Sequence, residues 1–244
     1  MDTKLAGKVA LVTGGAHRIG RVIILTLAKA GCHILLHYNA SHEAAEETAH
    51  EARGYGVQVL TYQANLQNPI ETQALLQRGI EEFGQIQILI NNAAIFPKDT
   101  VETISPEVWE HTFRVNLLSP LFLMQAFAKA LPKEQQGAIV NITDGNVNRP
   151  DRFSYAMSKG ALNHLTLLAA ATFAPKIRVN AIALGAMIAP LGQDEAYIRQ
   201  RTARIPLQRE GGVEPVTQAI LYLLQNEFVT GELLRVDGGD HLNT

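Results

Sequence analysis

The sequence predicts a single α/β domain in which a parallel, doubly wound sheet of seven strands is covered by helices on both faces. Two observations predict this fold: short apolar runs alternate with helical patterns along the chain, and each connection is long enough for a helical crossover. A third is that no proline-, glycine- or serine-rich linker, repeat or break in composition divides residues 1–244, so we expect one domain.

The predicted strands and helices keep to this alternation except in one stretch. Strands are expected at 8–13, 32–38, 57–63, 86–90, 138–143, 177–183 and 230–239. Helices are expected at 21–30, 41–53, 69–83, 105–131, 155–172, 194–204 and 214–224. Ser41 and Ser105 are predicted N-caps, and Pro69 suits a first helical turn. The stretch 185–207 departs from the alternation and is interpreted as a substrate loop.

Composition limits the classes of partner. Apolar residues make up 47% and charged residues 18% of the chain, which indicates a globular protein. The net charge of −2 and the lack of a basic block argue against nucleic acid and anionic membrane surfaces as partners. The single cysteine, Cys32, excludes an internal disulfide. No signal peptide precedes the first strand and no apolar run could span a bilayer, so we expect a soluble cytoplasmic protein.

A glycine-containing turn joins the first strand to the first helix, with the sequence Gly14-Gly15-Ala16-His17-Arg18-Ile19-Gly20. Glycines let the backbone approach a pyrophosphate, and a helix N-terminus offers free N–H groups to it. The turn therefore predicts the first half of a dinucleotide-binding unit. Because the spacing differs from G-x-G-x-x-G, an ordinary strand-to-helix turn is the alternative.

The end of the second strand bears on the choice of dinucleotide. An acidic residue there would hold the ribose 2′-hydroxyl of NAD. The chain instead has His37-Tyr38-Asn39-Ala40-Ser41, with no carboxylate to repel a 2′-phosphate. We therefore predict NADP(H), with Arg18, His37 and Ser41 as candidate phosphate contacts. His37 could instead be a packed histidine at a strand end.

A proton-delivery arrangement is predicted after the fifth strand. Tyr155 and Lys159 are four residues apart and share a helix face, where an ammonium would lower the pKa of the phenol. Asp144 ends the preceding strand and could meet that face. One carboxylate, one phenol and one ammonium suit acid–base catalysis. The alternatives are a chance Tyr-x-x-x-Lys pattern and a turn or capping aspartate.

Four further patterns have weaker implications. Asn91-Asn92-Ala93-Ala94 after the fourth strand suits close approach of a cofactor, or is a plain turn. Asn116 lies within a helical segment, as a surface residue or a buried link in a proton relay. His42, Glu46 and His50 recur every four residues but are more simply a solvated helix face, so no metal site is expected. The small residues on the helix from Tyr155 favour an oligomer interface.

Taken together, these motifs resemble the short-chain dehydrogenase/reductase family over almost the whole chain. The matching motifs are Thr13-Gly14-x-x-x-Arg18-Ile19-Gly20, Asn91-Asn92-Ala93, Asn116, Tyr155-x-x-x-Lys159 and Thr230-Gly231 with Val236-Asp237-Gly238-Gly239. The resemblance implies a Rossmann fold, a nicotinamide cofactor and a homotetramer. It also implies Tyr155 as proton donor, Lys159 as the residue that holds the nicotinamide ribose and lowers the tyrosine pKa, and Asn116 in a water relay.

Two departures from that family's usual pattern resemble the pteridine reductases and the related dihydromonapterin reductases. Arg18 replaces a glycine of the turn, and Thr143-Asp144 stands where the catalytic serine is usual. In that subgroup the arginine reaches cofactor phosphate and pterin, and the aspartate works with the tyrosine. Phe96 matches a phenylalanine that stacks the pterin, although it could be a core residue. His37-Tyr38 followed by Ser41 also matches.

Other positions differ from the subgroup. Asn39-Ala40 lacks an extra basic residue, Ala94 replaces a serine, Asn65 replaces an aspartate that meets adenine, and Leu184-Gly185 replaces Pro-Gly. The predicted cofactor-binding residues are Gly14, His17, Arg18, Ile19, Gly20, His37, Tyr38, Asn39, Ser41, Asn65, Leu66, Asn92, Ala93, Ala94, Tyr155, Lys159 and Gly185. The predicted catalytic residues are Asp144, Tyr155, Lys159 and Asn116, and the predicted substrate-binding residues are Arg18, Phe96, Asp144 and Tyr155.

The aspartate gives a chemical reason for the substrate class. A serine hydroxyl can donate to a ketone, whereas an ionised carboxylate only accepts. Asp144 therefore favours a flat heterocycle rich in N–H groups, and we predict an NADPH-dependent reductase of a dihydropterin, or of dihydrofolate, to the tetrahydro form. The alternatives are a carbonyl reductase such as a 3-oxoacyl-[acyl-carrier-protein] reductase, and an inactive cofactor-sensing module.

Overall fold

The computed structural model describes residues 4–188, 199, 200 and 202–242. Seven parallel strands form one sheet in the order β3-β2-β1-β4-β5-β6-β7, which confirms the predicted Rossmann-type fold. The strands are β1 (Val9–Val12), β2 (His33–Tyr38), β3 (Val59–Gln63), β4 (Ile88–Asn91), β5 (Gly137–Asp144), β6 (Ile177–Leu184) and β7 (Leu233–Val236). The strand order reverses between β1 and β4, and ligands bind such sheets at the carboxyl edge of that point.

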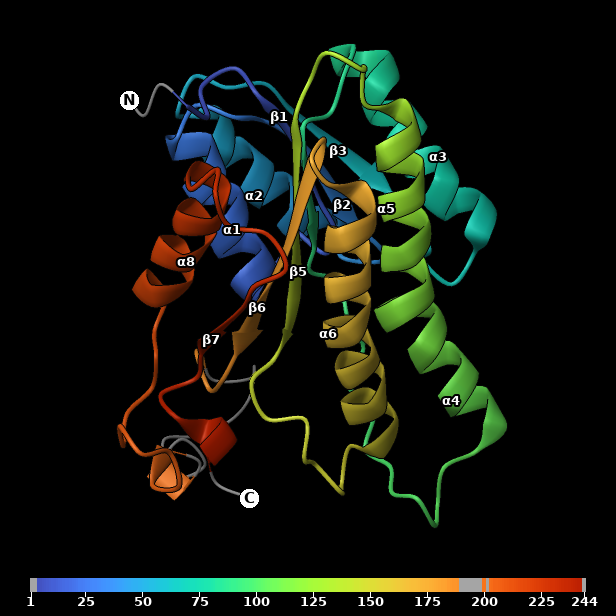
Figure 1. Cartoon of the computed structure of the whole chain (residues 1–244), viewed down its shortest axis with the longest axis vertical. Helices are drawn as coiled ribbons and strands as arrows, with labels where there is room; N and C mark the ends of the chain where they lie inside the picture. Colours follow the sequence, from blue (N-terminus) through green and yellow to red (C-terminus); the bar gives the residue numbers. More distant parts are fainter. Residues whose placement is uncertain (1–3, 189–198, 201, 243–244) are drawn as a thin grey trace.

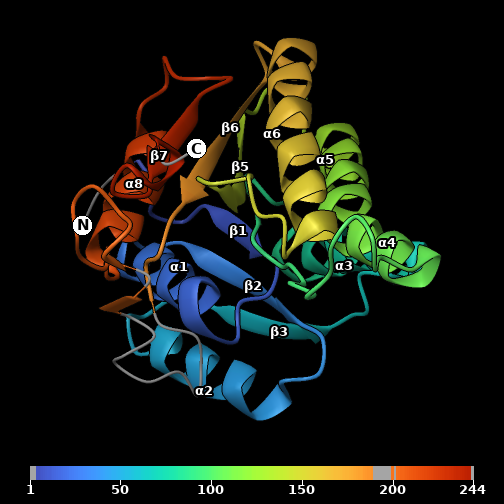
Figure 2. The same cartoon turned by 90° about the horizontal axis from the view of Figure 1, so that it is seen from below.

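Helices cover both faces of the sheet. Figure 1 shows α1, α2 and α8 on one side and α3, α5 and α6 on the other, and Figure 2 shows the same layers from below. The helices are α1 (Arg18–Lys29), α2 (His42–Arg53), α3 (Pro69–Phe83), α4 (Pro106–Phe113), α5 (Ser119–Ala130), α6 (Phe153–Phe173) and α8 (Glu214–Gln225). No helix of the described residues is long and apolar enough to cross a membrane.

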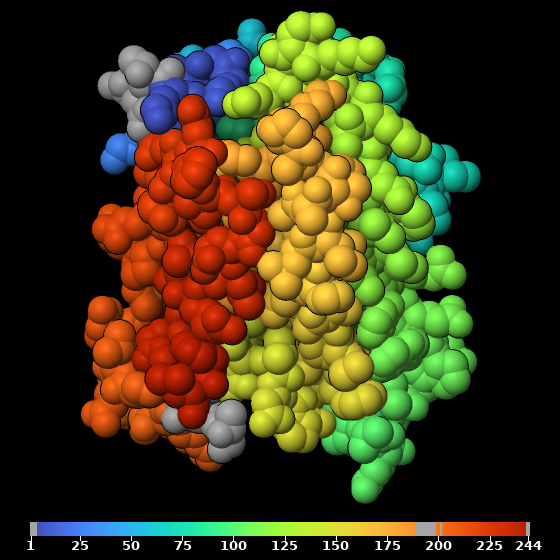
Figure 3. Space-filling view, in the orientation of Figure 1, coloured from blue at the N-terminus to red at the C-terminus, as the bar shows by residue number. Residues whose placement is uncertain are grey.

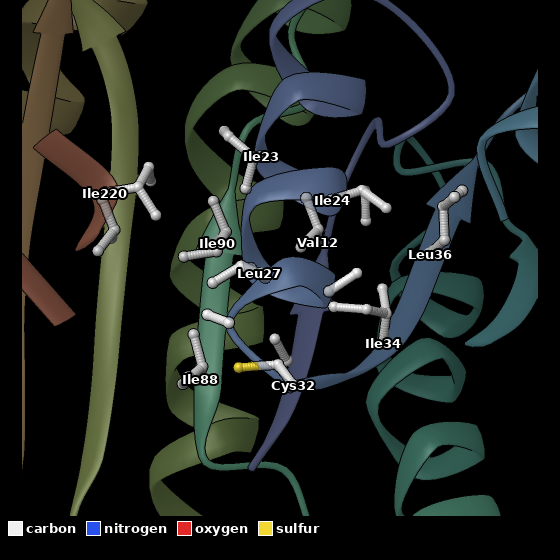
Figure 4. Close-up of a cluster of buried hydrophobic side chains, with 14 of the residues drawn as sticks. Val12, Ile23, Ile24, Leu27, Cys32, Ile34, Leu36, Ile88, Ile90 and Ile220 are labelled. Carbon is white, nitrogen blue, oxygen red and sulfur yellow. The ribbon is translucent and has the colours of Figure 1, made fainter. Parts of the chain in front are cut away.

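The strands are apolar on both sides because both sides are covered. Along β1, Ala10 and Val12 pack in the cluster under α1, whereas Val9 and Leu11 pack in the cluster on the opposite face. Figure 4 shows the first cluster, in which side chains of α1 meet those of β1, β2 and β4. This packing holds the ends of β1, β4 and β5 side by side at the edge where the predicted site residues lie.

The structure differs from the sequence prediction in the segment that contains Asn116. The predicted helix 105–131 is interrupted by a π-helical turn, Arg114–Leu118, between α4 and α5. Pro120 has no N–H to donate to the Asn116 carbonyl, and the Ser119 N–H bonds back to the Arg114 carbonyl, five residues earlier. The predicted substrate loop 185–207 includes residues 189–198 and 201, which lie outside the described residues, and so does most of its predicted helix 194–204.

Candidate active site

A cavity of about 640 Å³ opens at the carboxyl edge of the sheet. Its walls come from the turn between β1 and α1, the ends of β2, β4, β5 and β6 with the segments that follow β3, β4 and β6, and the start of α6. All the predicted cofactor-binding residues line it except Tyr38 and Ser41. Phe96 and Asp144 also line it, whereas Asn116 lies buried outside its wall. The volume is typical of small-molecule sites, which range from roughly 300 to 1,000 Å³.

The turn between β1 and α1 forms a close backbone cradle. Gly14 has a φ of +64°, and a Cβ there would lie 3.0 Å from the Ala93 Cα. A Cβ on Gly20 would lie 1.9 Å from the Gly14 carbonyl oxygen, so α1 begins directly against the turn. The first turn of α1 has no acidic residue, and its N-cap, His17, makes no capping bond through its side chain. The N–H groups there suit the pyrophosphate of a dinucleotide.

His37 supports this turn and does not serve as a cation. Its Nδ1 accepts from the Gly14 N–H at 3.1 Å, and its Nε2 lies 2.9 Å from the Ala64 carbonyl, to which it donates. Burial lowers the pKa of His37 to about 4, against the raising effect of the Ala64 bond. This corrects the expectation that His37 contacts a 2′-phosphate, because both ring nitrogens are bonded to backbone and the ring is neutral at neutral pH.

Four further predicted cofactor contacts lie at or beyond the ends of β1, β2 and β3. Arg18, at a φ of +47°, donates from Nη2 to the Ile188 carbonyl at 2.9 Å, which ties the turn to the segment after β6. The Tyr38 hydroxyl lies 2.8 Å from His42 Nδ1, and Ser41 is the N-cap of α2 without a side-chain bond to it. Asn65 accepts at Oδ1 from the Gln67 N–H, within its own turn. Cofactor contacts by these residues stay predictions.

Asp144 and Tyr155 meet as expected from their positions. The Tyr155 hydroxyl donates to Asp144 Oδ2 at 3.1 Å, and the Asn146 N–H donates to Oδ1 at 2.8 Å. The Asp144 side chain is 10% exposed and lies in the cavity wall. A carboxylate therefore occupies the wall beside the phenol.

The pKa of Tyr155 moves in the opposite direction to the sequence-based expectation. Burial, the charge of Asp144 and the hydrogen bond to Asp144 hold it well above its ordinary value, against a smaller lowering effect of Arg149. Lys159 has its Nζ 5.9 Å from the centre of the Tyr155 ring and donates to the Ile142 carbonyl at 2.8 Å. Burial lowers the pKa of Lys159 to about 8, against the raising effect of Asp144. Tyr155 is thus a protonated acid at neutral pH.

Phe96 lies over the phenol at the mouth of the cavity. Its ring meets the Tyr155 ring edge to face, with the centroids 4.4 Å apart, and the Arg152 guanidinium lies 4.5 Å from its centroid. Phe96 is 50% exposed, which is high for a phenylalanine. An aromatic surface is therefore available next to the acid.

Asn116 positions the segment that leads to Phe96. Its Oδ1 accepts from the Ile95 N–H at 2.9 Å, and its Nδ2 donates to the Ile95 carbonyl and to the Ser158 hydroxyl. Ser158 in turn donates to the Tyr155 carbonyl. The amide group thus joins the loop after β4 to the helix that carries the phenol, and its part in a water relay stays a prediction.

Three residues of this site have no role in the sequence-based prediction. Asp99 accepts from the Ser154 N–H at 3.0 Å and from the Ser154 hydroxyl, so it caps α6 from a distant loop. Arg149 donates to Asp144 Oδ1 at 3.1 Å and lies 3.7 Å from Asp240 Oδ2. The only sequence signal for Arg149 is a basic residue close to Asp144 in the same loop, and Asp240 is too distant in sequence to give one.

Comparisons with known proteins agree with this geometry. A family model described as enoyl-(acyl carrier protein) reductase matches residues 14–241. A relative from Bacillus subtilis (strain 168), the uncharacterized oxidoreductase YhdF, is 35% identical over 99% of the chain and 86% of its own length. The chain belongs to the short-chain dehydrogenase/reductase family. It is therefore an oxidoreductase by family.

Two further relatives of this short-chain dehydrogenase/reductase have named activities. The crystal structure of FolM alternative dihydrofolate reductase 1 from Brucella canis, complexed with NADP, has a TM-score of 0.93 and 35% identity, and the match covers 98% of this chain and 96% of that one. The 3-oxoacyl-[acyl-carrier-protein] reductase FabG of Staphylococcus aureus (strain Mu50 / ATCC 700699) is 29% identical over 96% of this chain and 98% of its own length.

Proposed function

We propose that this enzyme is an NADPH-dependent reductase of a dihydropterin or of dihydrofolate, with Tyr155 as the proton donor. The observation that carries the proposal is the carboxylate of Asp144 in the cavity wall, 3.1 Å from the phenol. An ionised carboxylate accepts hydrogen bonds and donates none, so it would repel a ketone oxygen and bind ring N–H and amino groups.

NADP(H) is supported by the fit of the cavity and by the relatives. The turn at Gly14 and Gly20 and the start of α1 suit a pyrophosphate, and no carboxylate follows β2 to exclude a 2′-phosphate. The Brucella canis structure was solved with NADP. A bound reduced nicotinamide supplies the hydride, which would go to a ring C=N carbon of the substrate.

The chain's own residues would supply the proton and orient the ring. Tyr155 keeps its proton at neutral pH because burial and Asp144 raise its pKa, so it can protonate a ring nitrogen. Asp144 would accept from the substrate's N–H groups, and Phe96 offers an aromatic surface to a flat ring. Lys159, with a pKa of about 8, can hold the nicotinamide ribose as a cation at neutral pH.

A carbonyl reductase of the 3-oxoacyl-[acyl-carrier-protein] type is the second candidate. It is favoured by the similarity to the Staphylococcus aureus enzyme over 96% of the chain. The site argues against it, because Asp144 stands where a donor to the substrate carbonyl is needed. The homotetramer implied by the family resemblance and the cytoplasmic location expected from the sequence stay predictions.

An assay of NADPH oxidation separates the two candidates. Purified protein is tested with dihydrobiopterin, dihydromonapterin, dihydrofolate and acetoacetyl-thioester substrates, and the reduced product is identified by chromatography. We expect turnover of at least one dihydropterin or of dihydrofolate, and a kcat/KM for the thioester that is lower by about tenfold or more. Turnover of the thioester alone would remove the proposed function.

A further inference from the structure

We infer that Arg149 is a positioning residue that holds the Asp144 carboxylate in the orientation needed to accept from the substrate, and thereby sets the preference for an N–H-bearing substrate. The inference deepens the proposed function and rests on it for the identity of the substrate. The contact itself rests on geometry alone and can be tested without any substrate.

Arg149 joins two segments that are far apart in the sequence. It lies in the loop between β5 and α6, and its side chain is 17% exposed. Its Nη2 donates to Asp144 Oδ1 at 3.1 Å and lies 3.7 Å from Oδ2 of Asp240, whose side chain is 2% exposed. Asp240 begins the C-terminal 3₁₀ turn, Asp240–Leu242. Figure 3 shows the C-terminal segment, in red, next to the β5–α6 loop.

This contact divides the two oxygens of Asp144 between different tasks. Oδ1 accepts from the Asn146 N–H and from Arg149, so both of its bonds come from the protein's own loop. Oδ2 accepts only from Tyr155 among the hydrogen bonds of the described residues, and Asp144 lines the cavity. The orientation of the carboxylate is therefore fixed, and Oδ2 is the oxygen left to meet a ligand.

The contact also compensates the charge of Asp144. A carboxylate that is nine-tenths buried is costly unless a cation and hydrogen bonds offset the lost hydration. The charged or titratable groups that face it or its loop in the described part of the chain are Tyr155, Lys159, Arg149, Asp240 and the Asp237–His241 pair, which packs against Gly145. Lys159 bonds to the Ile142 carbonyl, so Arg149 is the cation that contacts the carboxylate directly.

Loss of Arg149 would therefore change the chemistry of the wall. Without the guanidinium, Asp144 Oδ1 keeps only the bond from the Asn146 N–H, so the carboxylate can turn away from Tyr155 and from the position of the ligand. A misplaced acceptor would bind the N–H groups of a substrate less well, so the preference for an N–H-bearing substrate over a ketone would shrink.

The test measures kcat/KM for a dihydropterin and for acetoacetyl thioester at neutral pH in three variants. Arg149→Met removes the charge, Arg149→Lys keeps it, and Arg78→Met is the control because it removes an arginine from exposed ion pairs on α3. We expect Arg149→Met to lower kcat/KM for the dihydropterin by about tenfold or more and to leave kcat/KM for the thioester within about threefold of the wild type.

Arg149→Lys should restore most of the kcat/KM for the dihydropterin, and Arg78→Met should match the wild type. An equal loss for both substrates in Arg149→Met, or a lysine variant no better than the methionine variant, would overturn the inference, because it would indicate a packing role only. These measurements use saturating NADPH, so that a change in cofactor affinity does not affect the measured kcat/KM for the substrate.

A second measurement separates this inference from the proposed function. In a double-mutant cycle, the denaturant midpoint of unfolding is measured for Arg149→Met in the wild type and in Asp144→Asn. We expect Arg149→Met to lower the midpoint much more in the wild type than in the asparagine background. If the two substitutions change the midpoint additively, Arg149 and Asp144 do not interact, and the inference fails for any substrate. If the wild type turns over no dihydropterin but the two substitutions have non-additive effects on the unfolding midpoint, the proposed function is wrong and the contact between Arg149 and Asp144 is supported.

Discussion

The two halves of the cavity are built from different kinds of interaction. In the nucleotide half, the turn at Gly14 is held by neutral groups: His37 bonds its N–H, and the Asn92 amide donates to its carbonyl. In the catalytic half, the buried carboxylate of Asp144 is bonded to a cation, Arg149, and to the phenol of Tyr155. The first half supplies geometry that suits any dinucleotide, and the second supplies the charges that select the substrate and donate the proton.

The largest effect is expected in the catalytic half. Tyr155→Phe removes the proton donor and should lower kcat by about a thousandfold. The nucleotide half is unchanged, so NADPH affinity, measured by fluorescence titration, should stay within about threefold of the wild type. Tyr222→Phe is the matched control, since Tyr222 is exposed on α8. Unchanged turnover in Tyr155→Phe would show that the phenol in the catalytic half does not supply the proton.

In the nucleotide half, the expected effect is on stability against pH. The pKa of His37 is about 4 in the folded state and near 6.5 when unfolded, so the unfolded chain binds the proton more tightly. The stability from a neutral His37 is fully present above pH 6.5 and is lost as pH falls toward 4, by about 3 kcal/mol in total.

This prediction is checked by the free energy of unfolding in denaturant across that pH range. His37→Gln should flatten the dependence, whereas His50→Gln, which removes an exposed histidine of α2, should not. An equal slope in the wild type and in His37→Gln would show that His37 takes no part in acid unfolding.

A smaller effect is expected at the cap that joins the loop after β4 to the start of α6. Asp99→Ala leaves the Ser154 N–H at the start of α6 without its acceptor, and should cost about 1 kcal/mol of unfolding free energy. Asp99→Asn keeps an acceptor and should cost less. Glu102→Ala, an exposed residue of the same loop, is the control in thermal and denaturant unfolding. Equal stability of Asp99→Ala and Glu102→Ala would contradict the capping role.

The same difference between the halves explains what the sequence could predict. The strand–turn–helix pattern at Gly14 to Gly20 and the four-residue spacing of Tyr155 and Lys159 depend on local geometry, so their placement followed from spacing. The position of Asp144 at the end of β5 followed from the strand pattern. These features determine the fold and the place of the cavity.

The electrostatics could not be predicted in the same way. The pKa of Tyr155 depends on burial and on which charge touches the hydroxyl, and the structure places Asp144 there while Lys159 bonds to a carbonyl. Arg149 meets Asp240 only because the chain's C-terminal turn returns to the loop after β5. Tertiary contacts of this kind leave no periodic signal in the sequence.

The central claim is that the carboxylate at position 144 selects the substrate, and one ratio tests it directly. The ratio of kcat/KM for a dihydropterin to that for acetoacetyl thioester is measured at neutral pH in the wild type and in Asp144→Ser, which restores a hydroxyl donor. We expect the ratio to favour the dihydropterin in the wild type and to fall by about a hundredfold in the serine variant. A ratio that is the same in both proteins would contradict the account.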